Sequence, residues 1–440
     1  MPNAKVAMIG AGQLARMTHQ AAVDFDIELR VLAASADDSA VLGGAGYVLG
    51  TPDRLADLEA VASGVDVVTF DHELVSPSNL ATMQERKYNL QPHPSALYLA
   101  QDKLEARRSL SSRGFPCPAF SAPRSAGEVA DFAERYGWPV VLKARYGGYD
   151  GRGVRVVDST CRLDGISWLP DTLPGTGSPG GNTEKDAGGN AKAEARADAK
   201  EPAYIVEEYI DISAELSVIV ARSPSGEVAV YPPIQTTQSE GICRYLVMPA
   251  PVSDPVSKEA RGLAESIIID IDATGIVAVE MFLTGSGQLL VNELALRPHN
   301  SGHATIEACF TSQFHQHLRA VLDWPLGSTG MRVPAAAMVN LIGSEDYTDL
   351  ASWSRAALAV PDVNIHLYGK GVKPGRKLGH ITATAGSVDE ALQNALATAQ
   401  LQQIDLTGRE RAYRSYRRPS GQPSMDVRRD GAATGLALSP

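Results

Sequence analysis

The chain has 440 residues, 44% hydrophobic and 6% aromatic, values typical of a folded globular protein with two or three domains. Its formal net charge of -11 argues against general binding to DNA or RNA, but leaves room for a nucleotide substrate held by a local group of lysines and arginines. No run of about 18 apolar residues predicts a membrane span, no signal peptide is recognisable, and the four cysteines form no C-x-x-C pair, so we expect a cytoplasmic protein with reduced thiols.

The first hundred residues alternate apolar and amphipathic segments. Residues 5–9, 27–33 and 65–70 have the composition of short buried strands, and residues 13–24 have the pattern of a helix. Strand, helix and strand at this spacing predict a parallel α/β sheet.

A glycine turn follows the first strand. Gly10, Gly12 and Ala15 match the dinucleotide fingerprint G-x-G-x-x-G/A, which on its own favours an oxidoreductase with NAD or FAD. The fingerprint also needs an acid at the end of the second strand, and that strand runs into residues 33–35, with Asp37 too late. Two other interpretations stay open: the turn and the helix N-terminus hold a phosphate or ribose, or the turn is purely structural.

The middle of the chain begins with helices and continues with strands. Residues 101–118 and 126–136 predict helices, and residues 139–143, 154–157 and 204–207 predict strands. Further on, residues 215–222 and 227–231 have the pattern of a hairpin. A helix at 257–271 then precedes two strands at 276–283 and 288–293.

A glycine-rich loop joins the strands at 139–143 and 154–157. The first strand presents Lys143, and the loop holds four glycines: Gly147, Gly148, Gly151 and Gly153. Glycines let backbone N–H groups approach phosphate oxygens, and a lysine adds a point charge for the same oxygens. We therefore predict a flap that closes over a triphosphate. A simple hairpin turn would explain the glycines but not the Tyr149, Asp150 and Arg152 among them.

Two segments have a different composition. Residues 171–201 are rich in Gly, Ala, Asp and Lys with almost no large apolar side chains, which predicts a flexible insertion. Residues 409–440 have a similar character and predict a disordered tail.

Two glutamates lie in the last predicted hairpin. If the pairing axis passes between Ser286 and Gly287, Glu280 lies directly opposite Glu293 on the same face. Two neighbouring carboxylates inside apolar strands repel each other unless a cation lies between them, and oxygen ligands near a triphosphate favour Mg²⁺. The alternative, two surface glutamates, fits poorly with their apolar flanks.

A dense polar run follows the second glutamate. It contains Arg297, His299, Asn300, Ser301 and His303, and favours contacts with a substrate or an acyl phosphate. His299 and His303 are also conceivable zinc ligands, but neither a cysteine partner nor regular spacing supports zinc.

Five strings together resemble a known family: G-A-G-Q-L-A-R-M at 10–17, T-F-D-H-E-L-V at 69–75, G-G-Y-D-G-R-G at 147–153, N-E-L-A-L-R-P-H-N-S-G-H at 292–303 and Y-G-K-G-V-K-P-G-R-K-L-G-H at 368–380. They resemble the ATP-grasp superfamily and, within it, the N5-carboxyaminoimidazole ribonucleotide synthetases of purine biosynthesis. The resemblance covers about residues 5–390 outside the insertion.

The resemblance implies a fold and its domains. A Rossmann-like domain would span residues 1–100 and an ATP-grasp domain residues 101–325, with a lid subdomain at about 119–207. A small C-terminal domain would span residues 326–408.

The same resemblance implies a reaction. ATP would phosphorylate bicarbonate to carboxyphosphate, and the carboxylate would pass to the exocyclic amine of 5-aminoimidazole ribonucleotide, with Mg²⁺ as cofactor and a homodimer as the assembly. A labile acyl phosphate needs a closed site, which a glycine-rich lid can provide.

Roles for individual residues also follow from the resemblance. The ATP contacts would be Arg107, Lys143, Gly148, Tyr149, Asp150, Gly151, Arg152, Gly153, Val154, Glu207, Glu208, Tyr209, Ile210, Glu215, Asn292 and Glu293. Among them, residues 207–210 would line the adenine pocket and Glu215 would bind the ribose hydroxyls. The ribonucleotide contacts would be Gln13, Glu73, Tyr149, Asp150, Arg152, Asn300, Ser301, Lys370, Lys373, Arg376 and Lys377. The catalytic contacts would be Asp150, Arg152, Arg297 and Lys370, and the Mg²⁺ ligands Glu280 and Glu293.

The chain departs from the family pattern at several positions. Arg107 replaces a lysine that contacts the nucleotide, Asp71 replaces a glutamate, and Gln238 lies where many members carry a histidine. Three alternatives to the carboxylating ligase stay open: a formate-using transformylase of the same superfamily, a regulatory protein without catalysis, and the dinucleotide oxidoreductase. The presence of Lys143, Glu280 and Glu293 argues against the regulatory protein.

Overall fold

The computed structural model describes residues 3–147, 153–159, 163, 166, 202–239, 241–344, 358 and 360–400. The predicted insertion at 171–201 and tail at 409–440 lie outside these residues. Among the helices of the described ranges, none combines the length and the apolar character that crossing a membrane requires.

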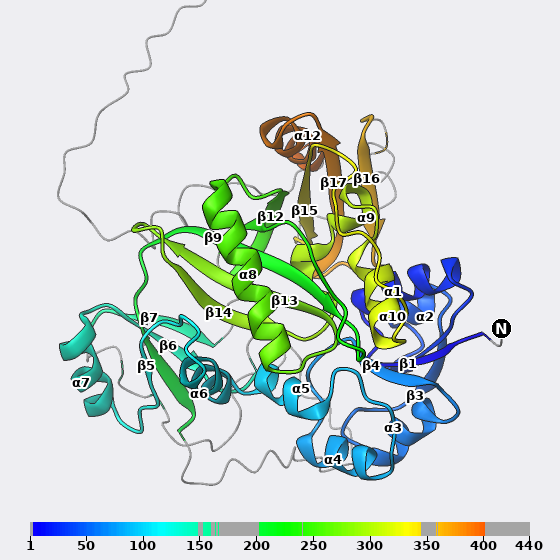
Figure 1. The fold of residues 1–440 in the computed structure, drawn as a ribbon, viewed down its shortest axis with the longest axis horizontal. Helices are drawn as coiled ribbons and strands as arrows, with labels where there is room; N and C mark the ends of the chain where they lie inside the picture. The colour runs from blue at the N-terminus through cyan, green and yellow to red at the C-terminus, as the bar shows by residue number, and fades with distance from the viewer. Residues whose placement is uncertain are drawn as a thin grey trace, which may run out of the picture.

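A parallel sheet of four strands forms the N-terminal part (Figure 1). Its order is β3-β2-β1-β4, with bounds Gly46–Leu49, Glu28–Ala33, Lys5–Ile9 and Val67–Phe70. The prediction of a parallel α/β sheet is confirmed, and helix α1 has the predicted bounds Gln13–Asp24. Four further helices were not predicted: α2 (Ser39–Leu42), α3 (Leu55–Ala62), α4 (Pro77–Glu85) and α5 (Pro94–Gln101).

The helix predicted at 101–118 is shorter in the structure. Helix α6 spans Lys103–Ser112, and Asp102 separates it from α5. The Asp102 side chain accepts hydrogen bonds from the backbone N–H groups of Leu104 and Glu105, which caps the helix at its N-terminus. A cap residue has non-helical backbone angles, so one continuous helix through Asp102 is not possible.

A small antiparallel sheet of order β5-β8-β6-β7 lies at the lower left of Figure 1. Its strands are Phe120–Ser121, Tyr204–Glu208, Val140–Ala144 and Val154–Val157. Helix α7 (Ala126–Tyr136), which has the predicted bounds, shares an apolar core with this sheet.

A large antiparallel sheet of nine strands fills the centre. Its order is β14-β13-β9-β11-β12-β15-β17-β16, and β10 pairs with β9. The bounds are β9 Ile212–Arg222, β10 Val228–Val230, β11 Ile234–Ser239, β12 Ile242–Met248, β13 Gly275–Thr284, β14 Leu289–Ala295, β15 Ala335–Ile342, β16 Val363–Leu367 and β17 Lys377–Ala385. Because β12 pairs with β15, the strands after residue 326 extend this sheet and do not form a separate one.

Helices cover both faces of the central sheet. They are α8 (Asp254–Asp270), the 3-10 helix η2 (Asn300–Gly302), α9 (Thr305–Ala308), α10 (Gln313–Val321) and α12 (Val388–Gln400). In β9, Val218 and Val220 share a core with α8, whereas Ile219 and Ala221 share one with α9. Burial on both faces explains why residues 218–221 of this strand are all apolar and do not alternate with polar residues. Each buried valine or isoleucine contributes about 1.5–3 kcal/mol to stability.

Candidate active site

The two glutamates of the β13–β14 hairpin lie opposite each other, as predicted. The route to this register differs from the prediction. Near the turn, Leu283 pairs with Leu289 and Phe282 with Leu290, which centres the hairpin on Ser286. A β-bulge beside Glu280 then shifts the register by one residue and brings Glu293 opposite it. Bulges re-aim side chains, and here the extra residue is Asn292.

We call Glu280 and Glu293 the acid pair. If both were ionised, the pair would carry one negative charge that its neighbours do not compensate well. Burial, followed by the charge of Glu293, raises the pKa of Glu280. Burial also opposes ionisation of Glu293, but Lys103 and Lys143 outweigh it and lower the pKa of that carboxyl. The Lys103 Nζ atom lies 3.2 Å from Glu293 Oε1. Without another cation, the pair therefore favours one protonated and one ionised carboxyl group.

A second buried cluster links the lysine strand to the acid strand. The Glu207 carboxylate lies 2.5 Å from Arg107 Nε and 2.6 Å from Lys143 Nζ, and it is almost fully buried. Burial opposes ionisation of Glu207, but Arg107 and Lys143 lower its pKa to about 2. Arg107 Nη2 and Lys143 Nζ also donate to the backbone and side-chain oxygens of Asn292, at 2.7 and 3.0 Å. We call these four residues the cation clamp.

Helix α6 connects both clusters. Lys103 and Arg107 lie one helical turn apart on the same face, so one reaches the acid pair and the other the cation clamp. The sequence interpretation missed Lys103. Its only local signal was the i, i+4 spacing to Arg107, which many surface helices share.

A further buried ion pair, also missed, fixes the start of the glycine-rich loop. Asp102 is fully buried and accepts from Arg145 Nε and Nη2, each at 2.8 Å. Arg145 stands two residues before Gly147, where the loop begins. The bidentate geometry therefore holds the root of the loop against α6.

Most of the loop itself lies outside the described residues, namely Gly148, Tyr149, Asp150, Gly151 and Arg152. The loop returns at Gly153, whose φ of +80° requires glycine and whose carbonyl accepts from Ala144 N at 2.8 Å. Val154 then pairs with Lys143 across β6 and β7. The end of the predicted flap thus lies directly beside its lysine.

A cavity of about 430 Å³ lies between the small sheet and the β13–β14 turn. It is lined by Cys117, Glu208, Tyr209, Ile210, Asp211, Thr284, Gly285, Ser286, Gln288 and Leu290. Three of the four residues expected around adenine, Glu208, Tyr209 and Ile210, are therefore here. The fourth, Glu207, does not line the cavity, because its carboxylate faces Arg107 and Lys143 within the cation clamp.

Glu215, expected at the ribose hydroxyls, lies on β9 beside β11. Gln238 Nε2 donates to its Oε2 at 2.8 Å. The glutamine at position 238, where many family members carry a histidine, therefore contacts Glu215. Burial raises the pKa of Glu215 to about 7.

The residues expected at the ribonucleotide meet from three parts of the chain. Arg297 Nε lies 2.9 Å from Glu73 Oε2. Lys370 Nζ donates to Gln13 Oε1, which joins the C-terminal strands to the first turn of α1. Burial lowers the pKa of Lys370.

The turn after β14 is held mainly by its own hydrogen bonds. Ser301 is buried, and its hydroxyl lies 2.7 Å from Ser217 Oγ and 2.8 Å from His299 Nδ1. Within the described residues, Asn300 Oδ1 is buried and accepts no hydrogen bond, so a substrate could satisfy it. His299 Nε2 lies 3.5 Å from Glu280 Oε1, and burial, then Arg297 and Lys377, lower the pKa of His299 to about 3.

The two histidines of this turn are not arranged to bind one zinc ion together. His299 faces Glu280, whereas His303 stacks on His380. Within the described ranges, the structure contains no group of three His, Cys, Asp or Glu side chains suited to a metal ion. Two carboxylates completed by phosphate oxygens fit Mg²⁺ better, because Mg²⁺ is commonly held by one or two carboxylates together with substrate phosphates.

The cationic residues near the C-terminus follow β16. Lys373 and Arg376 are exposed or nearly so, and Arg376 donates to the Gly371 carbonyl. Lys377 begins β17. Its charge contributes to the lowered pKa of His299, and it partly opposes the rise in the pKa of Glu280.

The glycine turn after β1 holds a carboxylate of the chain itself. Asp71 accepts from the backbone N–H groups of Gly12 and Ala15, at 2.5 and 3.2 Å. These amides are therefore not open to a phosphate, and a Cβ at Gly12 would lie 2.6 Å from Asp71 Oδ2. The contacts favour the structural interpretation of the turn over the phosphate and cofactor interpretations.

Comparisons with family models cover the described chain almost end to end. Residues 3–101 match the ribonucleotide synthetase preATP-grasp domain. Residues 108–169 and 179–314 match the ATP-grasp domain, and residues 336–394 match the phosphoribosylaminoimidazole carboxylase C-terminal domain.

Several similar proteins and solved structures carry the name N5-carboxyaminoimidazole ribonucleotide synthase or synthetase. The N5-carboxyaminoimidazole ribonucleotide synthase of Mycobacterium tuberculosis is 42% identical over 394 residues, which is 89% of this chain and 86% of that protein. The N5-carboxyaminoimidazole ribonucleotide synthetase structure from Thermotoga maritima has a TM-score of 0.75 at 32% identity and covers 90% and 98% of the two chains. An Aspergillus clavatus synthase in complex with ADP and 5-aminoimidazole ribonucleotide has a TM-score of 0.76 at 30% identity, covering 91% and 98%.

Proposed function

The chain belongs to the N5-carboxyaminoimidazole ribonucleotide synthase family, and from that premise we propose that it carboxylates 5-aminoimidazole ribonucleotide at the expense of ATP. Bicarbonate is phosphorylated by ATP to carboxyphosphate, and the exocyclic amine of the ribonucleotide then takes the carboxylate. The products are N5-carboxyaminoimidazole ribonucleotide, ADP and phosphate. The observation that carries the proposal is that Lys143 and Asn292 of the cation clamp lie next to the facing carboxyl groups of Glu280 and Glu293.

The cation clamp suits the phosphates of ATP. It contains two cations, Arg107 and Lys143, for the single carboxylate of Glu207. Arg107 alone can keep Glu207 ionised, so Lys143 is able to turn toward a phosphate oxygen. Positioning and charge stabilisation are the main requirements of phosphoryl transfer, and the clamp supplies both.

The acid pair suits Mg²⁺ in the same way. Glu280 and Glu293 present hard oxygen ligands and lack one positive charge. Bound Mg²⁺ would neutralise negative charge on the transferred phosphoryl group. Lys103 Nζ lies 3.2 Å from Glu293 Oε1 and restricts the direction of its carboxylate.

The residues around Arg297 suit the second half of the reaction. Arg297, held by Glu73, offers its guanidinium to the acyl phosphate. Its neighbour His299 is neutral, so it adds no charge that would hinder attack by the amine. Lys370 and the cations at 373, 376 and 377 provide charge for the ribonucleotide phosphate.

Phosphate release from ATP tests the proposal. We expect hydrolysis that rises at least several-fold when bicarbonate and 5-aminoimidazole ribonucleotide are both added. Formate in place of bicarbonate, and glycinamide ribonucleotide in place of the acceptor, are the comparison arms. Equal stimulation by formate would favour a transformylase, and turnover indifferent to the acceptor would overturn the proposal.

Assembly and location form a finer part of the proposal. We propose a homodimer in the cytoplasm, supported by the family resemblance. The described cysteines Cys117, Cys243 and Cys309 are free thiols, in keeping with a reducing compartment. Sedimentation at micromolar concentration tests the dimer.

A further inference from the structure

A buried stack of three imidazoles lies next to the active site, and no step described above uses it. His380 of β17 stacks on His366 of β16 with ring centroids 4.5 Å apart and on His303 with centroids 4.8 Å apart. The interplanar angles are 18° and 27°. His303 and His380 are fully buried, and burial keeps their pKa values well below the ordinary range, so the two rings are neutral near pH 7.

The stack has a fixed anchor at each end. His366 Nε2 lies 2.7 Å from Glu307 Oε1. At the other end, His303 Nδ1 lies 3.2 Å from Gln313 Nε2, and the same amide group also donates to the His299 carbonyl at 2.7 Å. The stack therefore touches the turn that carries Arg297 and His299 through Gln313 and His303.

Tyr368 connects the stack to the cationic residues. We define the basic loop as residues 368–377, between β16 and β17. The hydroxyl of Tyr368 lies 2.7 Å from His380 Nδ1, and its backbone N–H donates to the Leu378 carbonyl at 2.9 Å. These two hydrogen bonds hold the two ends of the basic loop together.

Tyr368 also meets the N-terminal sheet and the loop's first lysine. Its carbonyl accepts from Ser39 Oγ at 2.5 Å, and its ring centroid lies 5.8 Å from Lys370 Nζ. Lys370 in turn donates to Gln13. A buried aromatic ring with this many contacts has one position, and it restricts the directions open to Lys370.

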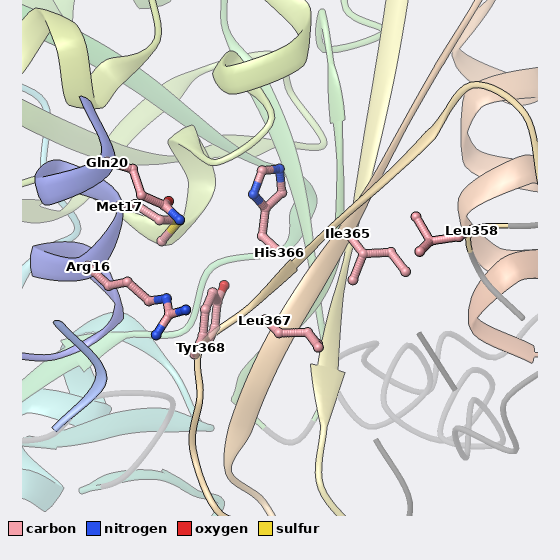
Figure 2. A pocket seen from close by; sticks show the side chains of 8 residues that line it. All are labelled: Arg16, Met17, Gln20, Leu358, Ile365, His366, Leu367 and Tyr368. Atoms are coloured by element: carbon pink, nitrogen blue, oxygen red, sulfur yellow. The ribbon is translucent and has the colours of Figure 1, made fainter. Parts of the chain in front are cut away.

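A cavity of about 350 Å³ borders the same tyrosine (Figure 2). Arg16, Met17 and Gln20 of α1 line one side, and residues 365–368 line the other. Tyr368 itself is fully buried and belongs to the same apolar core as Met17, so the cavity borders the ring without exposing it.

We propose that Tyr368 and His380 are positioning residues, which hold the basic loop over the ribonucleotide and align it with the Arg297–His299 turn through the imidazole stack. This inference rests on the proposed function, because it concerns the binding of the same ribonucleotide. Neither residue touches the reacting atoms. Their effect should therefore appear in the KM for the ribonucleotide and not in the KM for ATP.

Tyr368→Phe tests the inference because it removes the hydroxyl and keeps the ring. We expect the KM for 5-aminoimidazole ribonucleotide to rise about tenfold, since a small displacement of positioning groups is costly. The KM for ATP should change less than twofold. Hydrogen–deuterium exchange should show faster exchange of the amides of the basic loop.

Tyr231→Phe is the matched control. Tyr231 is also fully buried, and its hydroxyl donates to the Thr311 carbonyl at 2.9 Å, outside the site. Both variants should lose some thermal stability, but only Tyr368→Phe should change the KM for the ribonucleotide. An unchanged KM in Tyr368→Phe, or equal changes in both variants, overturns the inference. Lack of stimulation by the ribonucleotide in the parent protein would instead overturn the proposed function.

Discussion

The buried cation clamp and the half-buried acid pair lie side by side, and their central carboxyl groups have opposite pKa shifts. Glu207 has its pKa lowered to about 2, whereas Glu280 has its pKa raised to about 8. Burial opposes ionisation in both places, so the difference comes from the neighbours. Glu207 lies between two cations, and Glu280 lies opposite another carboxylate.

The difference shows how one fold can bind both an anion and a cation. The clamp contains one positive charge more than its carboxylate balances, and the acid pair, when both of its carboxyl groups are ionised, contains one negative charge more than Lys103 balances. A triphosphate with Mg²⁺ corrects both imbalances at once. Removal of individual charges should therefore affect the two clusters differently.

The largest effect is expected from Glu293→Ala. It removes a proposed Mg²⁺ ligand that Lys103 already orients. We expect kcat for acceptor-stimulated ATP hydrolysis to fall roughly 100- to 1,000-fold, because charge stabilisation during phosphoryl transfer is lost. Steady-state phosphate release measures this fall in kcat.

Glu134→Ala is the control for that variant, since Glu134 is an exposed acid on α7. It should leave kcat unchanged. A Glu293→Ala protein with more than a tenth of the parent activity would contradict the role of the acid pair.

Glu207→Gln should affect the clamp mainly through stability. The change leaves the buried cations Arg107 and Lys143 without their carboxylate. We expect the free energy of unfolding to fall by about 3–5 kcal/mol, as measured by urea denaturation without nucleotide. The surface acid Glu59, paired with Arg86, is the control, and Glu59→Gln should cost less than about 1 kcal/mol.

If ATP replaces the missing negative charge, the destabilised variant should recover more stability from the nucleotide than the parent does. Equal recovery would contradict the view that the clamp is short of one anion.

The acid pair should make the metal-free protein sensitive to pH. The folded-state pKa of Glu280, about 8, lies above its ordinary value of 4.5. Between those values the folded state binds more protons than the unfolded state, so stability falls as pH rises through the window. Denaturation in EDTA should show a loss of about 1 kcal/mol or more between pH 6 and pH 8.

Glu280→Gln isolates this contribution from that of Glu215, whose pKa of about 7 acts in the same direction. The variant should show a flatter pH dependence than the parent. Mg²⁺ with nucleotide should also flatten it in the parent, because metal binding requires both carboxylates ionised. An identical slope in parent and variant would mean that Glu280 ionises normally.

The acid pair could be predicted from sequence and the clamp only in part. Two glutamates at matched distances from a glycine turn, with apolar flanks, were enough to place Glu280 opposite Glu293. The bulge at Asn292 could not be predicted, because it depends on the contacts that Arg107 and Lys143 make with that residue from elsewhere.

The contacts that sequence analysis missed share a cause. Glu207 was assigned to adenine through the family resemblance, whereas its orientation in the structure depends on Arg107, 100 positions away in the chain. The pairs Lys103–Glu293 and Gln13–Lys370 are separated by 190 and 357 positions. Strand and helix patterns report local structure, whereas these contacts result from packing between the N-terminal sheet, α6 and the central sheet.

Arg107→Lys should give the smallest effect and the finest comparison of the two clusters. The change restores the lysine that the family pattern has at this position and keeps the charge. A lysine cannot donate from separate nitrogens to Glu207 and to the Asn292 carbonyl in the same fixed geometry. We expect a loss of about 1 kcal/mol in stability and a change of about two- to fivefold in the KM for ATP. The pH dependence set by Glu280 should stay the same, because the lysine keeps the positive charge that acts on Glu293 at this position. A changed pH dependence would show that the clamp and the acid pair act as one electrostatic unit and not as two.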